Sequence, residues 1–265
     1  MLHVETHAMS VFSAAAAGQL DVVCTLLDEG AKLDARDSDG RTALHHAAAN
    51  GHAVVVQSLL ERGARFDTFD EGNWSPLHSA AAAGRAEVVA YLIAAGTDID
   101  ASAASSGSTA LVLAASKGRT DVVRVLLGKG ANPLATDASG ATALHRAAGK
   151  GELAIVELLL GALPAGTLID VRDREGQTAF HVAAIHEQEG ACVLLAEKGA
   201  DLDTLNVAGE SPKSLLKPSL RSQLGLADAE EEEADHTDWL SANYPVPQAK
   251  LPRPNDYGVG VGRRR

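Results

Sequence analysis

The sequence predicts an all-α solenoid of about seven helix-turn-helix units with β-hairpin loops, followed by a tail. Two observations lead to this prediction. A motif that reads SPLHSAAAAG in one of its copies recurs at intervals of 33 to 36 residues, and each full copy runs into a second apolar stretch such as EVVAYLIAAG. Aromatic residues make up only 3% of the 265 residues. Alanine-rich helices that pack through small side chains, repeated at this interval, are typical of a solenoid.

The threonine or serine that opens each motif marks the start of a unit. A hydroxyl at this place accepts a hydrogen bond from an unpaired backbone N–H, so it caps the first helix of the unit. A divergent first copy has Met9 at the same position. The predicted array spans residues 9–217, after an N-terminal extension of residues 1–8, with units that start near residues 9, 42, 75, 109, 142, 178 and 211.

The other residues of a unit also have physical reasons. Proline at Pro76 fits the first helical turn, where its missing N–H leaves no bond unmade. Paired alanines let neighbouring first helices approach closely. Branched residues such as Val122-Val123 and Leu126-Leu127 form the buried stripe of a second helix. A glycine such as Gly130 ends that helix, and a hairpin turn follows, where Asn73 takes the place of glycine because asparagine tolerates a positive φ.

Period and motif together resemble the ankyrin repeat, whose signature is about 33 residues with T-P-L-H-x-A. In such an array the hairpins and first helices present an extended groove. No HExxH, nucleophile elbow or phosphate loop is found, so we expect no active site, cofactor or metal. Four histidines stand at the fourth motif position, where we expect each to bond the loop of an adjacent repeat: His45, His78, His145 and His181.

Composition limits the class of partner. The formal net charge of −12 argues against a general nucleic-acid or membrane-surface binder. No apolar run reaches the roughly 18 residues of a membrane span, and no secretory signal is visible. We therefore expect a protein of the cytoplasm and nucleus that is a monomer until it meets its partner.

The groove supplies the predicted protein-binding residues. Trp74 stands on a hairpin directly before the motif, and tryptophan is enriched among interface hot spots. The alternative is that it packs on its neighbouring hairpin. Charges are mixed at the N-terminal end and basic in the middle, which suits a partner with matching patches. The predicted binding residues are Asp39, Arg41, His46, Asp70, Glu71, Trp74, Ser79, Lys117, Arg119, Arg146, Lys150 and His186.

Three segments resemble the gankyrin family more closely than ankyrin repeats in general: NWSPLHSAAAAGRAEVV, KGANPLATDASGATALHRAAGKGELAIVELLL and DREGQTAFHVAA. The resemblance covers about residues 9–216. It implies a non-catalytic assembly chaperone of the 26S proteasome regulatory particle base, which binds the C-terminal domain of one ATPase subunit along its concave face. It also implies that Arg41, Trp74 and Lys117 contact this partner.

The sequence departs from that family in two places. VAAIH (182–186) stands where animal members have LxCxE, so binding to retinoblastoma protein is not implied. The tail, residues 218–265, is additional. Its acidic run and Pro/Gly-rich end lack the apolar content to fold alone, so we expect disorder. The alternatives are a proline-rich ligand at Pro245, Pro247, Pro252 and Pro254, or Trp239 and Tyr244 folded onto the last repeat.

Two other functions stay open. A generic ankyrin adaptor or inhibitor, acting for instance on a kinase or a transcription factor, would use the same groove. An enzyme is the third possibility, and no motif supports it.

Overall fold

The computed structural model of the chain describes residues 10–103, 106–163 and 169–226. The chain divides into two compact units, residues 1–224 and 225–265, and the helices of the described residues all lie in the first. The tail beyond residue 226, with its proline and aromatic residues, lies outside the described residues. So do residues 104–105 and 164–168.

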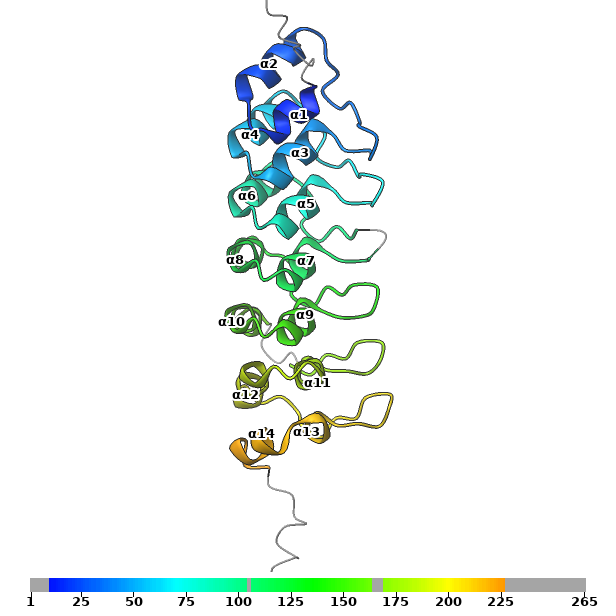
Figure 1. The fold of residues 1–265 in the computed structure, drawn as a ribbon, viewed down its shortest axis with the longest axis vertical. Coiled ribbons are helices and arrows are strands. Elements are labelled where there is room, and N and C mark those ends of the chain that lie inside the picture. The colour runs from blue at the N-terminus through cyan, green and yellow to red at the C-terminus, as the bar shows by residue number, and fades with distance from the viewer. Residues whose placement is uncertain (1–9, 104–105, 164–168, 227–265) are drawn as a thin grey trace, which may run out of the picture. The chain divides into compact units, whose positions relative to one another are not determined.

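Fourteen α-helices form within the described residues, in seven consecutive pairs (Figure 1). The first helices of the pairs are α1 (Val11–Ala16), α3 (Ala43–Asn50), α5 (Pro76–Ala83), α7 (Ala110–Ser116), α9 (Ala143–Lys150), α11 (Ala179–Ile185) and α13 (Pro212–Leu215). The second helices are α2 (Leu20–Asp28), α4 (Ala53–Glu61), α6 (Ala86–Ala94), α8 (Thr120–Gly128), α10 (Leu153–Ala162), α12 (Glu189–Glu197) and α14 (Pro218–Gln223). The predicted all-α repeat fold is confirmed.

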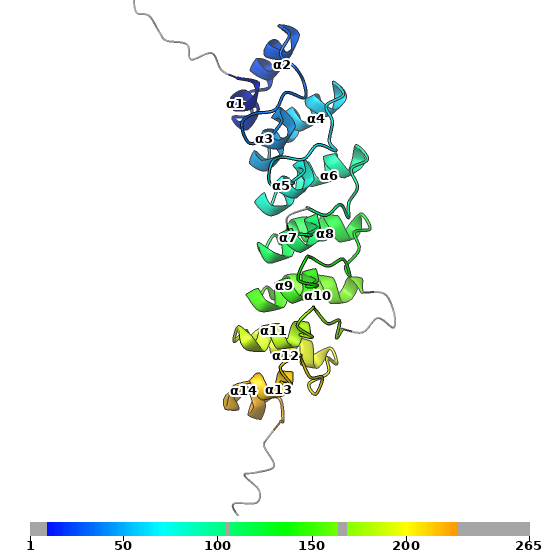
Figure 2. The same cartoon turned by 90° about the vertical axis from the view of Figure 1, so that its right-hand side faces the viewer.

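Each pair stacks on the next, so that first helices form one layer and second helices another (Figures 1 and 2). Ala47 and Ala48 of α3 are 0% exposed, because α3 lies between α1 and α5. In the second layer Leu126 is fully buried, as predicted. Leu127, predicted to share that stripe, is only half-buried, because the next residue along a helix turns about 100° away from the packed face.

The predicted caps are confirmed in five units, where the hydroxyl accepts a hydrogen bond from the backbone N–H three residues on: Thr42, Ser75, Thr109, Thr178 and Ser211. The first unit differs from the prediction. Its helix begins at Val11, and Ser10 accepts from the N–H of Ser13 at 3.2 Å. The hydroxyl of serine is the acceptor that a methionine side chain lacks. Met9 itself lies outside the described residues.

Each hairpin that precedes a first helix folds back over about five residues, and we call these hairpins fingers. They are loops rather than paired strands: the described residues contain one isolated bridge, between Thr136 and Thr142. Instead of a ladder of hydrogen bonds between strands, the side chain of an aspartate bonds the backbone of the finger. Asp37 Oδ1 accepts from the N–H groups of Asp39 (2.9 Å) and Arg41 (2.8 Å). In the next finger Asn73 has a φ of 58°, as predicted.

The array extends past its expected end. Residues 218–223 were predicted to be tail, but they form α14, with Pro218 in its first turn. Leu220 is 4% exposed, so this helix has the apolar contact that the prediction from composition missed. None of the described helices is both long and apolar enough to cross a membrane.

Candidate protein-binding surface

The motif histidines join one unit to the next. In unit 2, His45 Nδ1 accepts from the N–H of Thr42 (3.1 Å). Its Nε2 therefore carries the hydrogen and donates to the backbone oxygen of Trp74 at 3.0 Å. His145 and His181 make the same bond to Gln177 (3.0 Å) and Glu210 (3.1 Å). The predicted role of these histidines is confirmed.

Two units depart from this pattern. His78 donates to the oxygen of Ala101 at 2.9 Å, because the loop before unit 4 is longer. Unit 4 has Val112 at the histidine position, so it makes no such bond to unit 5. Burial lowers the pKa of all four histidines, which keeps them neutral. No group of three or more metal-ligating side chains occurs among the residues that the structure describes.

Trp74 stands in a depression between the fingers of units 2 and 3, and we call this the N-terminal depression. Its volume is about 750 Å³, and Asp39, Arg41, His46, Asn50, Asp70, Glu71, Trp74 and Ser79 are among the lining residues. The side chain of Trp74 is half-buried. Its backbone N–H donates to Asp70 Oδ1 at 2.8 Å, while its oxygen accepts from His45. Both backbone groups are therefore fixed, and the indole is presented from a rigid finger.

Three charged or titratable side chains of the N-terminal depression, Arg41, Asp70 and His46, are already paired within the molecule. Arg41 lies between two fingers, 3.6 Å from Asp39 and 3.5 Å from Asp70. His46 Nε2 lies 2.7 Å from Asp37 Oδ2. Burial alone would raise the pKa of Asp37, but hydrogen bonds from His46 and from two backbone N–H groups lower it overall.

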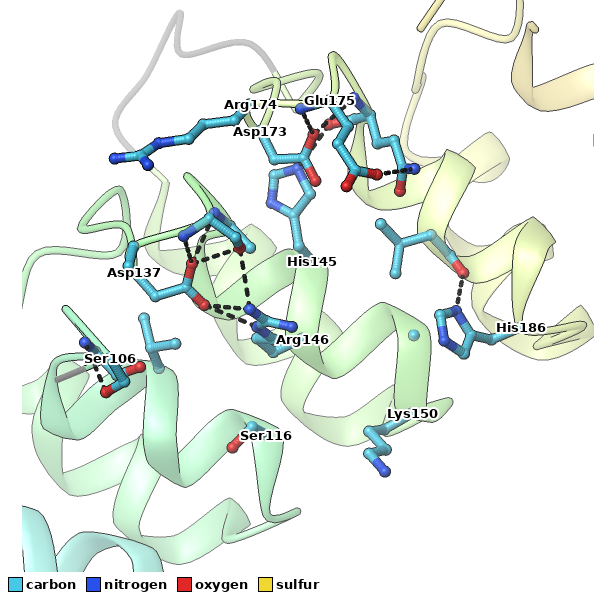
Figure 3. A pocket seen from close by; sticks show the side chains of 18 residues that line it. Ser106, Ser116, Asp137, His145, Arg146, Lys150, Asp173, Arg174, Glu175 and His186 are labelled. Carbon is cyan, nitrogen blue, oxygen red and sulfur yellow. Dashed lines mark hydrogen bonds and ion pairs between the residues drawn. The ribbon is translucent and has the colours of Figure 1, made fainter. Parts of the chain in front are cut away.

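A second depression lies between α7, α9, α11 and their fingers, and we call it the C-terminal depression (Figure 3). Its volume is about 870 Å³. Within it, Arg146 of α9 contacts the finger of its own unit. Its Nε donates to Asp137 Oδ2 at 2.9 Å, and its Nη2 contacts the same oxygen and donates to Oγ of Ser139 at 3.1 Å. These contacts outweigh burial and lower the pKa of Asp137. Lys150 and His186 line the same depression and are exposed.

A profile described as "Ankyrin repeats (3 copies)" matches residues 11–103 and 111–206. The chain belongs to the ankyrin-repeat family. Its fold is also similar to the crystal structure of the human ASB11 ankyrin repeat domain, with a TM-score of 0.73 and 26% identity, over 83% of this chain and 97% of that one. No curated protein matches the sequence. Ankyrin repeats form a protein-binding scaffold, while membership of the gankyrin family stays a prediction.

Two of the predicted binding residues, Lys117 and Arg119, line neither depression. Lys117 follows the end of α7 and is exposed, and its ammonium has no hydrogen-bonding or ionic partner among the described residues. Arg119 lies at the start of α8, where its Nε donates to the oxygen of Ala82 at 3.0 Å. Its side chain covers Gly84 of the preceding unit. Arg119 therefore ties two units of the scaffold together, a role that the sequence did not indicate.

Two residues that line the groove, Asp137 and Asp173, were not among the predicted binding residues. Turn chemistry explains one oxygen of Asp137 and one of Asp173: Oδ1 accepts from finger N–H groups. Both aspartates also line the C-terminal depression. The clue in the sequence is the helix residue nine positions later, since His46 and Arg146 stand in that place relative to their own finger aspartates.

Proposed function

We propose that the groove between the fingers and the first helices binds a partner protein, and that the N-terminal depression is its main contact. The observation that carries this proposal is the state of Trp74, half-buried on a finger with both backbone groups bonded. An aromatic side chain held by a rigid backbone loses little entropy when it binds, and tryptophan is over-represented among residues that dominate interfaces.

We further propose that the partner is the C-terminal domain of a proteasomal ATPase subunit, and that the chain is an assembly chaperone of the regulatory particle base. The resemblance of the repeats to gankyrin supports this. So does the free state of Lys117, whose ammonium is available to an acidic group of a partner. The pairs that Arg41 makes with Asp39 and Asp70 keep its side chain at the rim of the N-terminal depression. This function goes with a location in the cytoplasm and nucleus.

A generic ankyrin adaptor or inhibitor, for instance of a kinase or a transcription factor, is the second candidate. The C-terminal depression favours it, because this surface is as large as the one around Trp74 and offers different charges. A partner that used it would not need the three residues implied by the gankyrin resemblance.

Calorimetric titration against the isolated C-terminal domain of each proteasomal ATPase subunit separates the two candidates. We expect one domain to bind, and Trp74→Ala to weaken binding by about 2 kcal/mol, roughly thirtyfold. Lys117→Glu should weaken it as well. The matched control is Lys129→Glu, the same charge change at the exposed end of α8 in the second-helix layer.

The outcomes bear on different parts of the proposal. If no ATPase domain binds, the chaperone role is wrong and an adaptor with another partner remains. If a domain binds and Lys129→Glu weakens it as much as Trp74→Ala does, the groove is not the binding surface.

A further inference from the structure

In the finger aspartates the two carboxylate oxygens have different partners. In units 2 and 5 Oδ1 bonds the finger backbone, and Oδ2 faces a basic side chain nine residues on: Asp37 meets His46 at 2.7 Å, and Asp137 meets Arg146 at 2.9 Å. In unit 3 the helix residue is short, and the Oδ2 of its finger aspartate is met by Arg41 of the preceding finger at 3.5 Å.

Unit 6 has the aspartate without the cation. Asp173 Oδ1 accepts from the N–H groups of Glu175 (2.9 Å) and Gln177 (2.8 Å). Its Oδ2 accepts no hydrogen bond from any residue that the structure describes. The reason is the helix residue, Val182, which is apolar and short. The neighbouring Arg174 extends away from the carboxylate (Figure 3).

The space beside Asp173 corresponds to the place that Arg146 fills one unit earlier, because Asp173 and Val182 stand nine residues apart, as Asp137 and Arg146 do. Both Asp173 and Val182 line the C-terminal depression, and Cγ1 of Val182 lies close against Gly149, so α11 brings no cation to the carboxylate. Where Arg146 also bonds the hydroxyl of Ser139, the equivalent finger position in unit 6 is Glu175. A cation in this space would therefore meet two carboxylates instead of one carboxylate and one hydroxyl.

The opposite edge of the depression carries the positive charge of Lys150. Lys150 ends α9 and His186 follows α11. Both are exposed, and Lys150 has no ionic partner among the described residues. Since α9 starts at the finger and rises about 1.5 Å per residue, Lys150 lies on the order of 10 Å from the finger side. This distance along α9 is comparable to the diameter of one α-helix with its side chains.

The fingers offer no free strand edge to a partner in this region. The N–H of Arg174 donates to Ser139 at 3.0 Å, and the N–H of Val207 donates to Glu175 at 2.9 Å, so neighbouring fingers use these groups on each other. An extended peptide would find no backbone ladder there. A helix needs none, because its own backbone groups are already bonded.

We infer that the C-terminal depression receives a helix of the partner protein that places an arginine or lysine against Asp173 and an acidic residue against Lys150. This inference rests on the proposed groove function and adds the chemistry of the partner. The pair with Asp173 reproduces, between two molecules, the contact that Arg146 makes within one.

Selection from a phage library of helical peptides with randomised surface positions tests this inference. We expect the enriched peptides to carry basic residues along one flank and acidic residues along the other. Two substitutions should each weaken their binding roughly tenfold or more. Asp173→Asn removes the charge, and Val182→Arg supplies the cation from within the chain and so occupies the place of the partner's side chain.

The controls separate binding from folding. Asparagine can keep the finger intact, because Asn206 Oδ1 already accepts from the N–H of Glu210 at 2.9 Å in the last finger. Val207→Arg makes the same change as Val182→Arg at a valine that is 77% exposed and outside the depression, and it should leave binding unchanged. Circular dichroism melting confirms that each variant is folded.

The inference and the proposed function fail in different ways. If the selected peptides are indifferent to Asp173→Asn and Val182→Arg but are weakened by Lys150→Glu or Trp74→Ala, groove binding stands and this inference is wrong. If none of the four substitutions affects binding, both are wrong. Enriched peptides without basic residues, or a selection that enriches no peptide sensitive to the groove, also overturn the inference.

Discussion

His45 donates its Nε2 hydrogen to the backbone oxygen of Trp74 at 3.0 Å, so the histidine at the start of α3 also holds the finger that carries the tryptophan. Its other nitrogen bonds the cap of its own helix. Stability of the repeat and placement of the candidate hot spot thus depend on the same side chain. The same bond in other units can be tested without disturbing the N-terminal depression.

Replacing His145 by valine, the residue found at this position in unit 4, should lower the free energy of unfolding by about 2 kcal/mol. The substitution leaves the N–H of Thr142 without its partner and removes the bond between units to the oxygen of Gln177, which then accepts only from the N–H of Asp173. Urea unfolding followed by circular dichroism measures the change. A loss below about 0.5 kcal/mol would show that the bond between units contributes little.

Acid should destabilise the array in a window set by the buried histidines. Burial lowers the pKa of His45, His78, His145 and His181 in the folded state, whereas the unfolded chain titrates near pH 6.5. The unfolded chain therefore binds more protons as the pH falls below about 6.5, and the free energy of unfolding decreases. Above about pH 7 both states are neutral and the stability that depends on these groups is complete.

Urea unfolding at about pH 7.5 and pH 5.5 measures this dependence, and His145→Val should reduce it. The aspartates act elsewhere on the pH scale. The lowered pKa values of Asp37 and Asp137 mean that their contribution is lost only below about pH 3.9. Equal stability at the two pH values would contradict the assignment of the histidines as neutral in the fold.

Trp74→Ala should weaken partner binding while leaving the fold nearly unchanged. The inter-unit bond uses the backbone oxygen of Trp74, which alanine retains. The side chain is only half-buried, so we expect a loss of about 1 kcal/mol or less in the free energy of unfolding. Thermal melting checks this, with His45→Val as the contrasting variant that loses the bond itself. A large drop in stability would mean that the indole serves the fold rather than the partner.

Local chemistry is why so much of the fold could be predicted. A capping hydroxyl acts on an N–H three residues away, so Thr42 and Ser75 could be assigned from their neighbours. The positive φ of Asn73 follows from the turn it occupies. The first cap was misplaced by one residue because periodicity pointed to Met9, whereas the bond needs the oxygen of Ser10.

The parts of the groove that the sequence missed depend on contacts between units. Arg119 was assigned to the groove by its charge, but its position is set by the oxygen of Ala82, 37 residues earlier. The second oxygens of Asp137 and Asp173 face a helix that starts several residues later. No local rule states whether a basic side chain there reaches back to the finger, and only the packed units decide it.

Replacing three glycines by alanine, one at a time, should distinguish the effect of backbone strain on stability from the effect of crowding around an added Cβ. Gly161 lies inside α10, with open space around an added Cβ and no positive φ. Alanine there favours the helix and should raise the free energy of unfolding by about 0.5–1 kcal/mol. Gly63 also has open space but a φ of 88°, so alanine should lower the free energy of unfolding by about 1 kcal/mol.

Gly51 combines both effects. Its φ is 83°, and a Cβ would stand 2.7 Å from Cδ of Arg85, whose Nε donates to the oxygen of Ala49 at 3.2 Å. Alanine must therefore strain the backbone and also displace an arginine that bridges two units, so the loss should reach about 2 kcal/mol. Chemical unfolding of the three variants measures the order. If Gly51→Ala were no worse than Gly63→Ala, Arg85 would be moving aside freely, and its bridge from the start of α6 to the preceding unit would contribute no stability.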